Sequence, residues 1–161
     1  MVARSDYGGL RKVFVDECIK SGIQIKCPSS LCNNDKTDIR GGPSKKMAYI
    51  KNFIFNACPE NSFADGYCTE KLFQAIYCGC IPIYWGDPEN ESFFNKERII
   101  YCHGGAKNTI PFIKELLKDD VKLEKMFLKP LFNKNALTEI DKYVAKFDAV
   151  VDKWQKFRKC I

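Results

Sequence analysis

The sequence has a single histidine and lacks the short motifs of several large enzyme classes. It contains no Gly-x-Gly-x-x-Gly fingerprint and no phosphate-binding loop ending in Gly-Lys-Ser/Thr. No Asp-x-Asp pair stands at a strand end, where it would hold a metal ion against a diphosphate. His103 directly follows Cys102, and neighbours in a strand point to opposite faces, which argues against a Cys–His nucleophile pair. These absences weaken dinucleotide, P-loop and thiol-nucleophile interpretations.

Long apolar runs are also missing. The N-terminus, MVARSDYGGLRK, is polar, and no run approaches the ~20 residues that a membrane-spanning helix needs, so we expect no signal peptide and no membrane span in this chain. The 9 cysteines are an odd number and scattered, so they cannot all pair within the chain. Several lie in apolar patterns, which predicts reduced, buried thiols and a reducing intracellular compartment. Only Cys78-Gly-Cys80 approaches a paired metal-ligand spacing, so we expect no metal site.

Length and composition favour one globular domain. The 161 residues, 45% of them hydrophobic, are enough for a real core. Lys and Arg number 26 against 20 Asp and Glu, a net charge of +6. This modest excess suits phosphate ligands, acidic membranes or nucleic acid, but solubility alone explains it, and we expect no nucleic-acid partner.

The hydrophobic pattern predicts alternating strands and helices. The apolar runs IQIKC, FIFNA, IPIYW and RIIYC read as strands, and LRKVFVDECIKSG, KKMAYIKN, TEKLFQAIYCG and NTIPFIKELLKDD read as helices that alternate with much of this series. Strands that are apolar throughout favour an α/β fold, with a mostly parallel sheet covered by helices on both faces. From Leu123 onward the chain reads as helical, with an apolar stripe from Leu137 to Trp154 that packs back on the domain or meets a partner.

The stretch CPENSFADGYCTEKLFQAIYCGC, residues 58–80, lies between two of the predicted strands. Ligands of open α/β sheets bind at the carboxyl ends of the strands, and a helix N-terminus favours a phosphate, with Lys71 adding a full charge. The same residues also fit a plain loop: Thr69 is a good helix cap, Glu70 suits the helix dipole, and Asp65-Gly66 marks a turn. The composition of this stretch supports both interpretations.

The spacing of these residues resembles the donor-binding signature of the alpha-1,3-fucosyltransferases. In that family a strand ends in Glu-Asn-Ser, a Gly-Tyr-x-Thr-Glu-Lys turn opens a helix, and Ile-Pro-Ile-Tyr-Trp-Gly follows. The matching residues here are Glu60-Asn61-Ser62, Tyr67, Thr69-Glu70-Lys71 and the run from Pro82 to Gly86. Upstream, SDYGGLRKVFVDE resembles the segment that carries the family's diphosphate-binding arginine, which corresponds to Arg11.

The resemblance implies a Rossmann-like domain, the C-terminal half of a two-domain glycosyltransferase of the GT-B type. Its donor would be GDP-fucose, transferred with inversion to a glycan hydroxyl, with no further cofactor. Carried over by position, Arg11 and Lys71 would neutralise the diphosphate, while Asn61, Tyr67 and Glu70 would contact the nucleotide or the fucose. We expect residues 1–122 to form this donor domain and residues 123–161 a helical segment packed on it.

Two departures from the family limit the expected chemistry. The family's catalytic base lies in the N-terminal acceptor domain, which this chain has no room for, so the base is expected in a missing domain or a partner chain. Pro59 stands where relatives often have an aromatic residue, which predicts a changed loop shape. Two alternatives remain: a module that binds a GDP-sugar without turnover, and an interaction protein that uses its C-terminal amphipathic helix.

Overall fold

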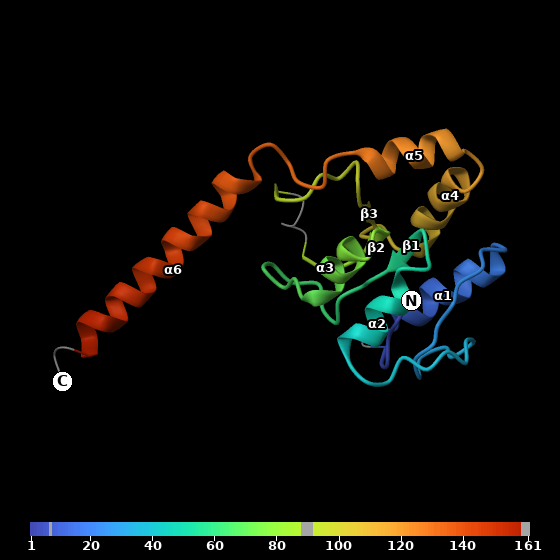
Figure 1. Cartoon of the computed structure of the whole chain (residues 1–161), viewed down its shortest axis with the longest axis horizontal. Helices are drawn as coiled ribbons and strands as arrows, with labels where there is room; N and C mark the ends of the chain where they lie inside the picture. The colour runs from blue at the N-terminus through green and yellow to red at the C-terminus, as the bar shows by residue number, and fades with distance from the viewer. Residues whose placement is uncertain (7, 88–91, 159–161) are drawn as a thin grey trace.

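The computed structural model describes residues 1–6, 8–87 and 92–158 (Figure 1). In chain order the elements are α1 (Leu10–Lys20), α2 (Pro43–Ile50), β1 (Phe55–Ala57), α3 (Glu70–Tyr77), β2 (Ile81–Tyr84), β3 (Ile100–Tyr101), α4 (Ala106–Leu116), α5 (Asp120–Leu128) and α6 (Ala136–Arg158). None of the helices within the described residues combines the length and hydropathy needed to cross a bilayer.

The strands form a parallel sheet in the order β1-β2-β3. Phe55 pairs with Ile81, and Ile83 pairs with Ile100. Every residue of β2 is buried, as expected for a central strand covered on both faces. The predicted α/β class with a parallel sheet between helices is therefore confirmed.

Side chains of β2 alternate between two cores. Ile81 and Ile83 pack with α1 and α4, whereas Tyr84 packs with Leu72 and Ala75 of α3. This is the two-residue period of a strand, with a helical layer on each face of the sheet. The sheet thus holds α1 and α3 on opposite faces, with the carboxyl ends of β1 and β2 between them.

The IQIKC segment (Ile23 to Cys27) was predicted as a strand, and this prediction is wrong. The segment forms no strand ladder, although the backbone carbonyl of Lys26 accepts a hydrogen bond from the amino group of Met1 at 2.7 Å. A cavity lined by both residues 22–26 and residues 52–57 separates the segment from β1. A strand needs a partner about 4.8 Å away, and this segment has none along most of its length.

Helices α5 and α6 differ in how far they contact the domain. Leu123 and Met126 of α5 pack into the core shared by α1 and α4. In contrast, α6 runs away from the remainder of the chain (Figure 1), and Leu137 and Phe147 are 76% and 68% exposed. Trp154 is the last residue of the predicted stripe, and its side chain is outside the part of the chain that the structure describes. The division at residue 122 remains a prediction.

The loop before α2 is tied to the domain by Asp35. Its carboxylate accepts hydrogen bonds from the Thr37 hydroxyl and amide and, through Oδ2, from the Tyr49 hydroxyl at 2.8 Å. The Thr37 bonds, followed by the Tyr49 bond, lower the pKa of Asp35 to about 2.

We expect Tyr49→Phe to raise the pKa of Asp35 toward its ordinary value. A lowered folded-state pKa means that these bonds stabilise the fold above about pH 4 and that the contribution is lost as the pH falls toward 2. Carboxyl NMR titration of both proteins measures the change. An unchanged Asp35 titration in Tyr49→Phe would contradict the role of the phenol.

Candidate functional site

The candidate site begins where the chain leaves β1. The ladder with β2 continues past the strand: the Cys58 amide donates to the Ile83 carbonyl at 2.9 Å, and the Glu60 amide donates to Trp85 at 2.7 Å. Pro59 lies between these two donors, where alternation along the strand turns an N–H away from β2. The missing N–H of Pro59 therefore leaves the ladder intact, and the carbonyl of Pro59 is used instead by Arg11.

Glu60 is the buried centre of this region. Its side chain is fully buried, and its two oxygens accept hydrogen bonds from the Thr69 amide at 2.7 Å and the Thr69 hydroxyl at 2.6 and 2.8 Å. The Lys71 ammonium donates to Oε2 at 2.8 Å. A buried carboxylate needs such partners because desolvation of the charge is costly. Glu60 thereby joins the end of β1 to the first turn of α3.

Thr69 occupies the N-cap position of α3 as predicted, but the predicted capping bond is absent. No side-chain oxygen of Thr69 caps the helix, because the hydroxyl is engaged with Glu60 and accepts a bond from Lys71 at 2.7 Å. The first backbone N–H groups of α3 therefore have no acceptor on the N-cap side chain, and the helix dipole adds a partial positive charge at this end of the helix. This end of α3 is suited to an anion.

Arg11 reaches the same region from α1. Arg11 as a whole is 4% exposed, and its guanidinium donates to the Ser5 carbonyl at 2.7 Å, the Pro59 carbonyl at 3.0 Å and Asn61 Oδ1 at 2.6 Å. All three acceptors are uncharged, so none of these bonds neutralises the guanidinium. Arg11 and Asn61, 50 positions apart in the sequence, are thus brought into contact.

Cationic side chains from α1, α2 and α3 line a small crevice. Arg11, Lys46 and Lys71 line it, together with residues 2–3 of the N-terminus and residues 56–59 at the end of β1. Its volume of about 10 Å³ is at the lower limit for holding one water molecule, so a larger anion would lie at its mouth.

Glu70 lies beside this crevice, and its two oxygens are 3.6 and 3.8 Å from Lys46 and Lys71. Partial burial acts to raise the pKa of Glu70, but Lys71, the Thr69 hydroxyl and Lys46 outweigh it, so the pKa is lowered. Glu70 is therefore held as a carboxylate at neutral pH.

The predicted site residues are brought together in part. Arg11 contacts Asn61, Lys71 pairs with Glu70, and Arg11 and Lys71 share the crevice. Tyr67 is not among the crevice residues that the structure describes; its amide closes a turn onto the Ala64 carbonyl at 3.1 Å. The roles of all five residues toward a ligand remain predictions.

Two residues were missing from the predicted set. Glu60 belongs to the matched motif, but its sequence position does not reveal that it is buried against Lys71. Lys46 stands in a lysine-containing helix, where charge alone does not distinguish it from its neighbour Lys45. Both assignments depend on contacts between elements that are distant from each other in the sequence.

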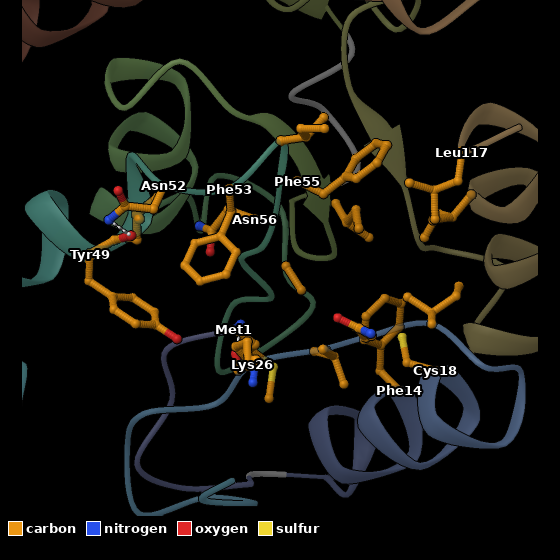
Figure 2. Close-up of a pocket in the computed structure, with 18 of the residues that line it drawn as sticks. Met1, Phe14, Cys18, Lys26, Tyr49, Asn52, Phe53, Phe55, Asn56 and Leu117 are labelled. Carbon is orange, nitrogen blue, oxygen red and sulfur yellow. Dashed lines mark hydrogen bonds between the residues drawn. The ribbon is translucent and has the colours of Figure 1, made fainter. Parts of the chain in front are cut away.

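A much larger cavity of about 450 Å³ lies away from these residues (Figure 2). It is mainly apolar, and Figure 2 shows Phe14 and Cys18 of α1 on one side with Phe53 and Phe55 on the other. None of the predicted site residues lines it. Cavity size alone would therefore not select the crevice at which Arg11, Lys46 and Lys71 meet.

Comparison with known proteins gives a consistent result, although no protein-family model matches the chain. The chain is 36% identical over 73 residues to an alpha-(1,3)-fucosyltransferase, FucT, of Helicobacter pylori, covering 44% of this chain and 15% of the relative. It is 30% identical over 133 residues to GDP-fucose protein O-fucosyltransferase 3 of Xenopus tropicalis, covering 68% and 28%.

The fold agrees with these matches. A crystal structure of alpha1,3-fucosyltransferase with GDP-fucose superposes with a TM-score of 0.72 at 26% identity, covering 83% of this chain and 38% of that one. The chain therefore spans well under half the length of each of these relatives. Sequence and structural similarity agree, and the chain belongs to the fucosyltransferase family.

Proposed function

We propose that the chain is the donor-binding part of a fucosyltransferase, with GDP-fucose as the donor and a glycan hydroxyl as the acceptor. Residues 1–122 form the donor domain in this proposal, placed C-terminally in a longer or two-part enzyme, and residues 123–161 add a helical segment. The observation that carries it is the crevice, where Arg11 and Lys71 from different helices meet beside the uncapped start of α3.

The proposed chemistry is an inverting displacement. The bond between the fucose anomeric carbon and the diphosphate breaks, and GDP leaves with the electron pair. The acceptor oxygen bonds to the opposite face of the sugar, and its proton passes to a carboxylate base expected outside this chain. Arg11 and Lys71 would stabilise the charge that grows on the departing phosphate, which lowers the barrier without reorganisation.

Each remaining predicted residue has a proposed role. Asn61 would orient Arg11 and contact the nucleotide, and Tyr67 would close over it from the turn that precedes α3. Glu70, kept ionised by its lysine neighbours, would accept hydrogen bonds from sugar hydroxyls. The second candidate is binding without turnover, in which the same crevice holds the donor and no acceptor is activated.

We expect Lys71→Ala to weaken GDP binding about tenfold to a hundredfold, because a charge-assisted hydrogen bond contributes about 1.5–3 kcal/mol. Isothermal titration calorimetry with GDP and GDP-fucose measures this. Lys142→Ala is the control, because it removes an exposed lysine that pairs with Glu139 on α6. Circular dichroism confirms that both variants are folded.

Binding weaker than millimolar by the unaltered chain, with no further loss in Lys71→Ala, would overturn the donor-site proposal. Release of GDP from GDP-fucose separates the two candidates. A chain that binds GDP-fucose and never releases GDP, even when supplied with acceptor, supports the binding module.

A further inference from the structure

A third cation reaches the crevice from α2. Lys46 lines it beside Arg11 and Lys71, and its side chain is 22% exposed, against 57% for the adjacent Lys45. Lysine side chains are mostly exposed, and where they are partly buried their apolar stems pack while the charged end stays near solvent. The stem of Lys46 therefore holds its ammonium at the crevice, whereas Lys45 points to solvent and Asp38.

The partner of Lys46 in the free protein is weak. Its Nζ lies 3.6 Å from Oε1 of Glu70, a carboxylate that is 55% exposed. Oε2 of the same carboxylate lies 3.8 Å from Lys71, so Glu70 serves two ammonium groups at once. Long, solvated ion pairs of this kind contribute little, so a better acceptor can replace Glu70.

The positive charges around the crevice are not fully compensated within the protein, which favours an anion there. Lys71 is compensated by the buried Glu60 at 2.8 Å, while the Arg11 guanidinium contacts uncharged oxygens. Asp6, just before α1, accepts hydrogen bonds from the backbone amides of Arg11 and Lys12 at 2.9 and 3.2 Å. A nucleoside diphosphate carries more negative charge than Arg11, the partly compensated Lys71 and the α3 dipole can balance, which favours a third cation beside it.

We propose that Lys46 is a phosphate-binding residue of the donor site, which exchanges Glu70 for a diphosphate oxygen when the nucleotide binds. Lysine suits this role, because its flexible stem carries a compact point charge that phosphate oxygens accept readily. The exchange releases one oxygen of Glu70, which then becomes free to accept a hydrogen bond from the sugar. This inference rests on the proposed function and adds α2 to a site otherwise built from α1 and α3.

The test compares Lys46→Gln with its neighbour Lys45→Gln, which makes the same charge change on the same helix. Calorimetric titration uses guanosine, GMP and GDP at two salt concentrations. We expect Lys46→Gln to weaken GDP about tenfold and GMP less, with guanosine unchanged, and to reduce the salt dependence of GDP binding. Lys45→Gln should stay within about twofold of the unaltered chain, and Lys46→Arg should retain most of the affinity for GDP.

Equal losses of GDP affinity in Lys46→Gln and Lys45→Gln would overturn the assignment, because the effect would then come from the overall positive charge and not from a contact of Lys46. So would tighter GDP binding in Lys46→Gln, or the same loss for guanosine as for GDP. Failure of the proposed function gives a different result from failure of the Lys46 assignment. If the proposed function is wrong, the unaltered chain binds no GDP. If only the Lys46 assignment is wrong, the unaltered chain binds GDP and Lys46→Gln binds it equally well.

Discussion

Glu60→Gln should lower the free energy of unfolding by about 3 kcal/mol, the lower end of what removing one partner of a buried ion pair costs. The fully buried side chain accepts bonds from the Thr69 amide, the Thr69 hydroxyl and the Lys71 ammonium. Glutamine keeps the shape but has a single acceptor oxygen and no charge, so Lys71 loses the closer of its two carboxylate partners. Urea denaturation measures the change.

The same substitution should weaken GDP binding, because Glu60 holds both Lys71 and the first turn of α3 in place. If Glu60 merely masked the charge of Lys71, its removal would strengthen GDP binding, and that result would contradict the positioning role. Glu97→Gln is the matched control. Glu97 pairs with Lys129 at the same distance, 2.8 Å, but the two side chains are 61% and 45% exposed, so the loss should stay below about 1 kcal/mol.

Gly86→Ala should also destabilise the protein by about 3 kcal/mol, at the upper end of ordinary overpacking, and lower the melting temperature by roughly 6–12 °C. A Cβ at Gly86 would meet the hydroxyl of Tyr84, lie 2.6 Å from Tyr84 Cζ and lie 2.7 Å from Glu60 Cγ. Tyr84 is fully buried, and Glu60 is fixed by its bonds, so neither side chain can move away at low cost. The clash should therefore displace Glu60 and weaken GDP binding too.

Gly104→Ala separates this clash from the general effect of replacing a glycine. Neither Gly86 nor Gly104 has a positive φ, so alanine is not strained by backbone conformation at either position. At Gly104 the new Cβ would come within 3.0 Å only of Asn108 Nδ2, the end of a flexible side chain, at 2.9 Å. Thermal unfolding that shows equal losses for both variants would show that the packing around Glu60 is not responsible for the effect at Gly86.

The local features of the site were predictable from the sequence. Helix α3 begins and ends where its pattern indicated, with Gly79 after it at a φ of 77°. The turn at Asp65-Gly66 and the buried strand β2 were also expected, because short-range preferences and burial dominate there. The motif around these elements identified the family, since its spacing extends over strand, turn and helix together.

What the sequence by itself determined about this protein is thus the order of its elements, the α/β class and the family motif. Only the tertiary structure decided that Glu60 is buried against Lys71, that Arg11 contacts Asn61 and that Lys46 rather than Lys45 lines the crevice. It also decided that residues 23–27 form no strand and that the stripe of α6 is exposed from Leu137 to Phe147. Local preferences depend on neighbouring residues, whereas these outcomes depend on which elements pack together across tens of positions, a property that no short segment carries.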